Sequence, residues 1–275
     1  MTKYFSILLL ALCLSLPMTA QGTFQFVHPW QGKRVAYFGD SITDPKNNGS
    51  KKKYWGFLSD WLGITPFVYG VSGRTWSDIP RQAEKLKAEH GDDFDAILIF
   101  IGTNDFNGGE PVGEWFSECE DSVTASRGDK HPKQRYLRRR RVPSMDQSTL
   151  RGNINIALSR IHKLFPGKQV VLLTPIHRAY FEAGDRNIQP TEEYQNWTGE
   201  FFSHYVESVK EAGNIWAVPV IDLNSVSGLF PLDEANARLY FHNAVRDRLH
   251  PNDAGHARIA QTLVYQLAAL PCSFE

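Results

Sequence analysis

Four residues spread along this chain have the types and spacing needed for acyl transfer from an ester. Ser41 ends one apolar run, Asn104 follows another, and Asp247 lies three residues before His250 near the C-terminal end. A serine attacks a carbonyl carbon only when a base takes its proton, and a carboxylate beside the histidine holds the imidazole in the required tautomer. The pattern therefore favours a serine hydrolase with Ser41 as nucleophile, His250 as base and Asp247 as orienting carboxylate.

The carbonyl oxygen that gains negative charge during such an attack needs hydrogen-bond donors already in position. Three donors are available near the predicted nucleophile: the backbone N–H groups of Ser41 and Gly73 and the side-chain amide of Asn104. Gly73 suits this role because a side chain would crowd a backbone N–H that must face the substrate. We therefore predict an oxyanion hole formed by Ser41, Gly73 and Asn104.

Apolar runs that alternate with helical patterns must position these residues. We expect strands over 34–38, 66–71, 96–101, 170–173 and 215–220, and helices over about 54–62, 78–90, 148–165, 191–212 and 253–271. The run at 96–101 is apolar throughout, which is typical of a strand covered on both faces. This order predicts an α/β fold, a three-layer α/β/α sandwich with a parallel sheet and right-handed crossovers. Reactive groups then collect at the carboxyl edge of the sheet.

The first twenty residues have the features of a secretory signal peptide. Lys3 precedes an apolar stretch, and Met18-Thr19-Ala20 forms a small-residue cleavage site. The apolar stretch is too short to cross a bilayer, which needs ~20 residues. We therefore expect residues 1–20 to be removed, residues 21–275 to form a single domain, and the protein to be secreted or periplasmic.

The composition narrows the range of partners. The formal net charge is zero, which argues against a nucleic-acid binder. Two cysteines, Cys119 and Cys272, follow the predicted signal peptide, too few for a disulfide scaffold, and whether they pair stays open. We expect neither a metal nor a cofactor. The histidines at 242, 250 and 256 lack metal-ligand spacing, and the glycines at 70 and 73 lack dinucleotide spacing.

Four short blocks occur in a fixed order, and together they resemble the SGNH (GDSL-type) hydrolase family. They are Gly39-Asp40-Ser41, Gly70-Val71-Ser72-Gly73, Gly102-Thr103-Asn104-Asp105 and Asp247-Arg248-Leu249-His250-Pro251. The resemblance spans residues 39–251. It implies a flavodoxin-like fold with five parallel strands in the order 2-1-3-4-5. It also implies the roles already given for Ser41, Asp247, His250, Gly73 and Asn104.

A long polar excursion, residues 106–147, separates the third strand from its helix. Eight of the fifteen residues in 127–141 are Lys or Arg, and five acids lie in 110–121. A hairpin turning near 128–132 would place the acids opposite the bases, as a solvated arm. An anion- or glycan-binding arm is the alternative. Because the excursion starts just after Asn104, we expect it to border the substrate pocket.

These observations predict a secreted serine esterase that removes short acyl groups, acetyl foremost, from carbohydrate. The carbohydrate rests on export and on three aromatic residues expected near the reactive edge, Trp55, Trp76 and Trp115. His177 and Arg178 follow the fourth strand and are candidate substrate contacts. A lipid or lysophospholipid acylhydrolase, a non-catalytic glycan-binding protein and a flavin-binding protein are the alternatives. The natural ester, its acyl length and the oligomeric state stay open.

Overall fold

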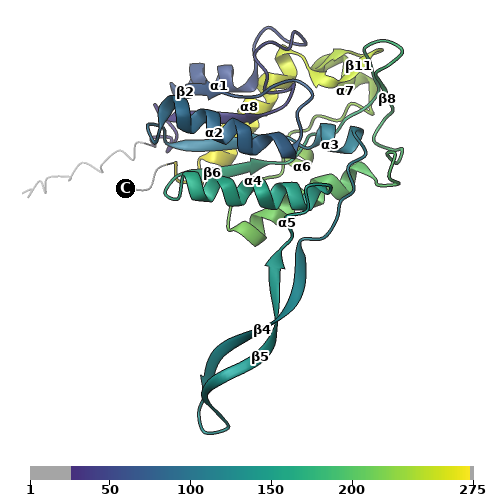
Figure 1. The fold of residues 1–275 in the computed structure, drawn as a ribbon. Coiled ribbons are helices and arrows are strands. Elements are labelled where there is room, and N and C mark those ends of the chain that lie inside the picture. The colour runs from purple at the N-terminus through teal and green to yellow at the C-terminus, as the bar shows by residue number, and fades with distance from the viewer. Residues whose placement is uncertain (1–25, 273–275) are drawn as a thin grey trace, which may run out of the picture.

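Five parallel strands form the central sheet of the computed structural model, which describes residues 26–272 (Figure 1). Across the sheet the strands are β2 (Thr65–Val68), β1 (Arg34–Gly39), β3 (Ala96–Phe100), β6 (Gln169–Leu173) and β9 (Val220–Ile221). In sequence order this arrangement is 2-1-3-4-5, so both the fold class and the strand order are confirmed. All the carboxyl ends of these strands lie along one edge of the sheet.

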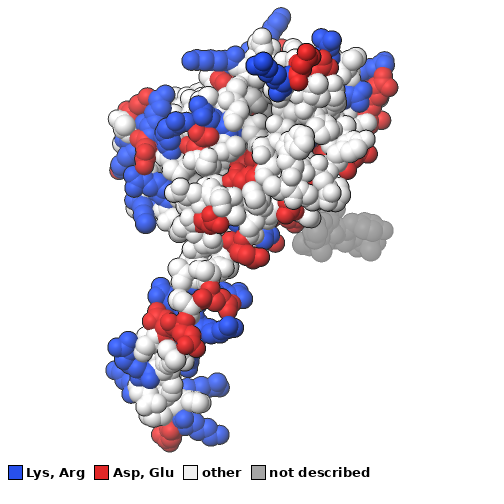
Figure 2. Space-filling model, turned by 45° about the vertical axis from the view of Figure 1, so that its right-hand side comes forward, with Lys and Arg blue, Asp and Glu red and all other residues white. Residues whose placement is uncertain are grey.

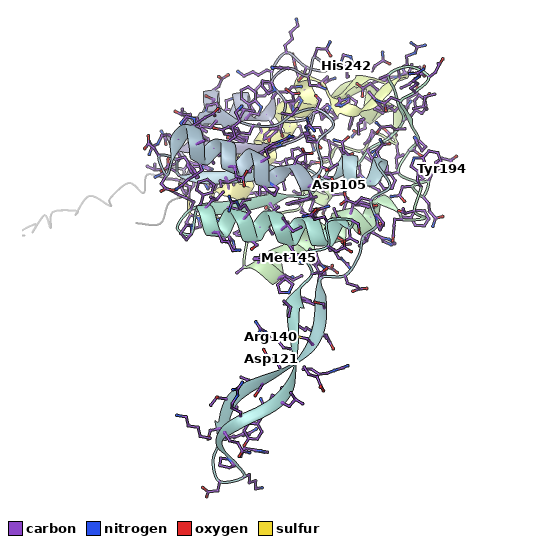
Figure 3. The ribbon with its side chains drawn as sticks, viewed as in Figure 1. Asp105, Asp121, Arg140, Met145, Tyr194 and His242 are labelled. Carbon is purple, nitrogen blue, oxygen red and sulfur yellow. The ribbon has the colours of Figure 1, made fainter. Side chains whose placement is uncertain are left out.

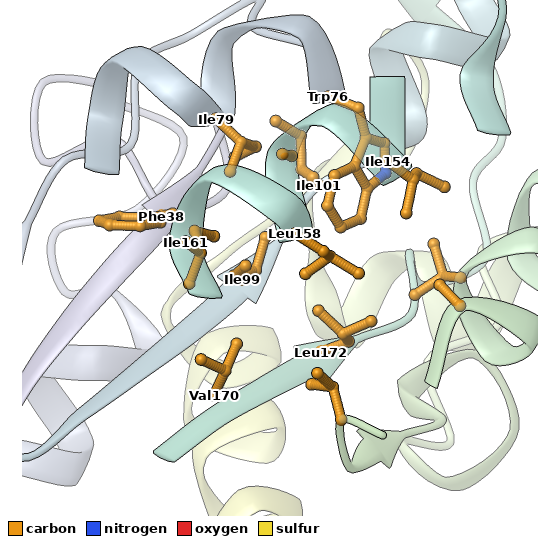
Figure 4. Close-up of a cluster of buried hydrophobic side chains, with 14 of the residues drawn as sticks. Phe38, Trp76, Ile79, Ile99, Ile101, Ile154, Leu158, Ile161, Val170 and Leu172 are labelled. Atoms are coloured by element: carbon orange, nitrogen blue, oxygen red, sulfur yellow. The ribbon is translucent and has the colours of Figure 1, made fainter. Parts of the chain in front are cut away.

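Helices cover both faces of the sheet. One layer contains α1 (Tyr54–Leu62) and α8 (Asp253–Leu267); the other contains α2 (Ile79–His90), α4 (Leu150–Leu164) and α5 (Phe202–Trp216). All five residues of β3 are buried, with Ile97 and Ile99 in the α2–α4–α5 layer and Leu98 and Phe100 in the other. Figure 4 shows part of this core, where Leu158 of α4 lies among strand side chains. The continuous apolar run at 96–101 therefore has the physical cause that was predicted.

Two predicted elements differ from the structure. The helix expected over 191–212 begins only at Phe202 and continues to Trp216, which shortens the fifth strand to Val220–Ile221. The side-chain oxygen of Asn196 accepts hydrogen bonds from the backbone N–H groups of Thr198 and Glu200, and this turn keeps the preceding segment out of the helix. The Trp216 side chain donates to Asn155 of α4, which holds the end of α5 in place.

A second, four-stranded sheet lies beyond the carboxyl edge and was not predicted. Its order is β10 (Phe241–Asn243), β11 (Asp247–Pro251), β7 (Phe181–Glu182) and β8 (Ile188–Gln189). The segment expected as a turn before the last helix is therefore the strand β11, paired on both sides. Four short helical segments complete the chain: η1 (Trp76–Asp78), α3 (Thr103–Asn107), α6 (Leu223–Val226) and α7 (Glu234–Tyr240).

The polar excursion contains the predicted hairpin, formed by β4 (Phe116–Arg127) and β5 (His131–Pro143). It points away from the domain on the side of α4 and α5 (Figure 1), so the expectation that it borders the pocket is wrong. The cause is the segment that leads into it. The backbone oxygens of Pro111 and Val112 accept hydrogen bonds from the first turn of α4, which carries the chain away from Asn104 before the hairpin begins.

The remaining sequence-based expectations concern the termini and the cysteines. The predicted signal peptide, residues 1–20, lies outside the described residues. Among the helices within residues 26–272, none is long and apolar enough to cross a lipid bilayer. Cys119 is an exposed free thiol on β4, and Cys272 is a buried free thiol, so the two do not pair in this structure.

Candidate active site

Ser41, His250 and Asp247 form a continuous chain of hydrogen bonds at the carboxyl edge of the main sheet. The Nε2 atom of His250 lies 2.9 Å from the Oγ atom of Ser41, and its Nδ1 atom lies 3.0 Å from both carboxylate oxygens of Asp247. The Asp247 carboxylate also accepts the backbone N–H of His250 at 3.0 Å. Ser41 follows the end of β1, and the other two residues belong to β11. The fold thus brings Ser41 into contact with His250, 209 positions later in the chain.

In a regular strand, residues three apart point to opposite faces. Within β11, however, the Oδ1 atom of Asp247 accepts the backbone N–H groups of Leu249 at 3.2 Å and of His250 at 3.0 Å, and this turn lets the Asp247 carboxylate reach the His250 ring. The partner strand β7 places Phe181 opposite Asp247, and the Phe181 ring meets the His250 ring edge to face at 5.1 Å. The pairing with β10 holds the other side of the strand. With its faces packed and both ring nitrogens engaged, the imidazole has one orientation available, which is what a general base requires.

Close approach of backbone segments positions the nucleophile. A Cβ atom on Gly39 would lie 2.5 Å from the side-chain oxygen of Thr43, and one on Gly70 would lie 2.6 Å from the Thr43 Cβ atom. Only glycine at these two positions lets Thr43 fit between the ends of β1 and β2. The side-chain amide of Gln82, from α2, bonds both the N–H and the carbonyl of Gly39 at 2.9 Å. Close packing by Thr43 and hydrogen bonds from Gln82 thus fix the end of β1, which positions Ser41.

The three predicted oxyanion donors follow the ends of β1, β2 and β3: Ser41 and Gly73 lie on loops, and Asn104 lies in the first turn of α3. Within residues 26–272, the backbone N–H groups of Ser41 and Gly73 donate to no other atom, so both are free to bind a ligand. One N–H of the Asn104 amide donates to the carbonyl of Arg74 at 3.0 Å, which leaves the second available. Gly73 has φ +80° with no atom within 4 Å of a Cβ position, so backbone conformation rather than crowding requires glycine there.

Replacement of Asn104 tests whether its amide contacts the reacting oxygen. We expect Asn104→Ala to lower kcat by ~100- to 1000-fold on p-nitrophenyl acetate, because one preorganised donor is lost from the transition state. KM should change little, since the donor acts on charge that develops only during the reaction. A loss below tenfold in steady-state kinetics would reduce Asn104 to a support for the Arg74 loop.

Two aspartates that were given no role from the sequence bind residues 72–78, the segment that contains Gly73 and is here called the oxyanion loop. Asp44 accepts the backbone N–H and the hydroxyl of Ser72 at 2.8 Å each, and Asp105 accepts the backbone N–H of Trp76 at 2.9 Å. Partial burial raises the pKa of Asp44, but hydrogen bonds from Lys46 and Ser72 outweigh it and lower the pKa overall. Burial, and then the nearby Glu110 carboxylate, raise the pKa of Asp105 well above its usual range. Asp105 is the last residue of the third family block and Asp44 lies three residues after Ser41, and this proximity was the available signal.

The aspartate that precedes the nucleophile, Asp40, is buried, and the pKa of its carboxyl group is shifted. Burial raises the pKa of Asp40 to about 6, although a hydrogen bond from the Ile42 N–H and the charge of His250 oppose the shift. The Asp40 carboxylate accepts that N–H at 3.0 Å, which shapes the turn around Ser41. Asp40 therefore serves the geometry of the nucleophile at a cost in stability whenever it is ionised.

This cost predicts a pH-dependent gain from Asp40→Asn, whose amide oxygen can still accept the Ile42 N–H. A folded-state pKa of about 6 against the ordinary 3.8 means that wild type loses stability as the pH rises from 4 to 6. We expect the variant to match wild type near pH 4 and to exceed it by up to about 3 kcal/mol above pH 7. Urea unfolding at a series of pH values measures this. A difference that does not vary with pH would contradict the assignment.

The two candidate substrate contacts after the fourth strand have different outcomes. Arg178 is only 1% exposed, and its guanidinium donates to the backbone and side-chain oxygens of Thr103 and to Gln189. The prediction is therefore wrong for Arg178, which instead anchors the start of α3, the helix that contains Asn104. His177 is half-buried and lies 2.5 Å from a Glu192 oxygen. For His177 a substrate contact stays a prediction.

Of the three tryptophans expected near this edge, only Trp55 lies there, half-buried, with its ring N–H donating to the Thr43 carbonyl at 3.0 Å. Trp76 is fully buried in the core, and Trp115 is buried with its ring nitrogen bonded to Glu211, because both rings complete the α2–α4–α5 layer. By contrast, Trp197 is 90% exposed and Tyr194 is 64% exposed. Both belong to the segment that packs on α3 through the Asn196 side chain, and Figure 3 shows Tyr194 at the periphery of the domain.

A comparison with models of protein families identifies the family of this chain. Residues 37–258 match the model of the GDSL-like Lipase/Acylhydrolase family, a range that includes all five residues of the predicted site. The chain belongs to this family. It is therefore an acylhydrolase, a hydrolase of carboxylic ester bonds, and the resemblance of its four sequence blocks is confirmed.

Solved structures extend the likeness to the whole fold. A protein from Lactobacillus plantarum superposes with a TM-score of 0.66 at 24% identity, covering 87% of this chain and 98% of its own. A possible lipase from Chitinophaga pinensis gives 0.62 at 23% identity, with coverage of 88% and 100%. Axe2, an acetylxylan esterase from Geobacillus stearothermophilus, gives 0.50 at 19% identity, with coverage of 90% and 99%. A comparison with curated proteins found no match.

Proposed function

We propose that this acylhydrolase is an exported serine esterase that releases short acyl groups, acetyl foremost, from carbohydrate through an acyl-Ser41 intermediate. The single observation that carries the proposal is the contact between the Ser41 Oγ and His250 Nε2 atoms, with Asp247 on the opposite ring nitrogen. A binding module would need neither a paired serine nor unoccupied donors beside it. The arrangement supports nucleophilic catalysis rather than simple recognition.

The proposed reaction has two halves that use the same residues. Ser41 Oγ bonds to the ester carbonyl carbon while its proton passes to His250 Nε2, and the carbonyl oxygen takes the negative charge beside Ser41, Gly73 and Asn104. The tetrahedral intermediate collapses, and the alcohol leaves with the proton from His250. A water molecule then attacks the acyl-serine carbon and gives its proton to His250. Collapse releases the carboxylic acid and returns the proton to Ser41.

Exposed aromatic residues, the shared fold and the signal-like N-terminus support carbohydrate as the substrate class. Trp197 and Tyr194 expose large aromatic faces on the segment that packs against α3, and such faces suit sugar rings. The fold is shared with an enzyme described as an acetylxylan esterase. Export, proposed from the signal-like residues 1–20, would bring the enzyme to extracellular carbohydrate.

An ester panel tests the proposal. The purified protein is given p-nitrophenyl esters from acetate to palmitate, acetylated xylo-oligosaccharides and a lysophospholipid, and the acid released is measured directly. We expect the highest kcat/KM on acetyl esters and acetate release from the glycan. A preference for long chains or for the lysophospholipid would favour the lipid acylhydrolase instead. Glycan binding without turnover on any ester would reject the catalytic proposal.

A further inference from the structure

The hairpin of β4 and β5, here called the arm, extends away from the domain. Each strand pairs only with the other, over twelve and thirteen residues. Beyond the stem, where the Ser144 N–H donates to the Trp115 carbonyl, the arm stands clear of the domain (Figure 1). Isolated two-stranded hairpins are marginally stable in water. The arm is therefore a segment that another molecule would stabilise.

Charge is distributed unevenly along the arm. In the half near the stem, bases face acids: Arg140 lies 2.9 Å from Asp121, and Glu118 pairs with both Arg139 and Arg141 at 3.3 Å. Figure 3 shows Arg140 beside Asp121. The far half has four bases and a single acid, Asp129; the bases are Arg127, Lys130, Lys133 and Arg135. None of these four forms an ion pair with any residue of 26–272. The end of the arm is thus an unneutralised cation cluster, here called the tip.

A groove of the opposite sign lies at the stem. It has a volume of about 520 Å³ and is lined by four glutamates, one arginine and one histidine. Three of the glutamates have partners: Glu211 pairs with Arg151 at 2.7 Å, Glu207 with Lys210 at 2.8 Å, and Glu200 lies 2.5 Å from the His204 ring. Glu114 forms no ion pair with any residue of 26–272, so the groove keeps an excess of negative charge. Figure 2 shows red surface where the arm leaves the domain and blue surface along the arm, toward its end. The negative stem groove and the positive tip are separated by the length of β4, ~40 Å at the usual rise per strand residue.

Exposed apolar side chains mark the middle of the arm. Leu137 is 69% exposed and Val123 is 46% exposed. They belong to the adjacent register pairs Ser122↔Leu137 and Val123↔Tyr136, about halfway between the stem and the turn. Because neighbouring register positions point to opposite faces of a hairpin, each face of the arm exposes one large apolar side chain at its middle.

We propose that two copies of this chain associate through their arms, side by side and antiparallel, about a two-fold axis through the arm midpoints. In a two-fold interface, residues near the axis meet their own copies, so the faces that carry Leu137 pack together and each Leu137 covers its copy. The same operation carries each tip to the partner's stem groove. Cations then face glutamates twice. The opposite charges of the tip and the stem groove, with Leu137 between them, fit a second copy.

A polyanion such as nucleic acid fits these observations less well. The groove glutamates and the paired acids near the stem would repel it, and it would leave Leu137 in water. Cationic edge strands also resist indiscriminate strand pairing, which leaves a specific, charge-directed contact as the favoured use of the arm.

Light scattering coupled to size exclusion tests the association directly. At tens of micromolar protein and low salt, we expect a mass twice that of one chain, with dissociation favoured by high salt because the tip–groove contacts are screened. The triple charge reversal in the tip, Arg127→Glu, Lys130→Glu and Lys133→Glu, should give the mass of a monomer. The triple groove reversal Glu114→Lys, Glu200→Lys, Glu207→Lys should do the same.

Mixing the two reversed variants gives the decisive result. Each alone brings like charges together, but in the mixed pair an acidic tip meets a basic groove and a basic tip meets an acidic groove. We therefore expect the mixture to regain the doubled mass. An equal number of reversals elsewhere, Lys85→Glu, Lys163→Glu and Arg186→Glu, all exposed, should leave the dimer intact.

Replacement of residues 116–143 by a short Gly/Ser linker provides a second control. The variant should be a single chain that hydrolyses p-nitrophenyl acetate at the wild-type rate, because the arm lies away from the site. A wild-type protein of single-chain mass would overturn the proposal, as would a dimer that tip reversal leaves unchanged. Tip-dependent binding of heparin by a single-chain protein would also overturn it and identify a polyanion as the partner.

Discussion

Ser41→Ala should abolish ester hydrolysis, with kcat on p-nitrophenyl acetate reduced by about 10⁶-fold, the scale of a lost serine nucleophile. Without Oγ there is no atom to form the acyl intermediate, although the oxyanion donors and the substrate site remain. The fold should be unaffected, because the Ser41 side chain bonds only the His250 ring. KM measured on the residual activity should therefore stay near the wild-type value.

Covalent labelling identifies the nucleophile independently of rates. A fluorophosphonate should add its mass to the wild-type peptide that contains Ser41 and to no peptide of the Ser41→Ala variant. Ser77→Ala is the matched control, since Ser77 is exposed on the oxyanion loop and its hydroxyl bonds only Thr75. That variant should keep full activity and labelling. An active Ser41→Ala protein, or labelling at another serine, would reject the assignment.

His250→Gln should cost nearly as much as the loss of the nucleophile, about 10⁶-fold in kcat, because the serine proton then has no acceptor in position. The double variant with Ser41→Ala should be no slower than either single variant, since the two groups act as one unit. Asp247→Asn should cost less, about 10⁴-fold, by favouring the wrong imidazole tautomer.

Rates and labelling separate these roles from structural damage. Each variant should unfold in urea near the wild-type midpoint; in Asp247→Asn the amide oxygen can still accept the backbone N–H groups of Leu249 and His250. The His250→Gln variant should react with the fluorophosphonate far more slowly than wild type, because the label needs the same activated serine. A kcat within tenfold of wild type would exclude His250 as the base.

The elements with strong local signals were predictable from the sequence. The helix Tyr54–Leu62 and the strand Ala96–Phe100 match their expected bounds closely, because helical spacing in one and unbroken apolar character in the other are local properties. The chemistry of the site was also predictable. Acyl transfer requires a serine, a base and fixed donors, and few residues of those types stand at strand ends. The strand order came from resemblance to a family.

The direction of the arm and the fate of individual side chains were decided only by the tertiary structure. Arg178 and Trp76 look accessible in sequence, but the packing of α3 and the helix layers buries both. Strand β11 exists because β7 and β10 flank it, and those partners are too short to have a periodicity of their own. Local sequence determines which residues favour a strand, a turn or a reaction. Burial and pairing depend on residues far away in the chain, so only the folded molecule decides them.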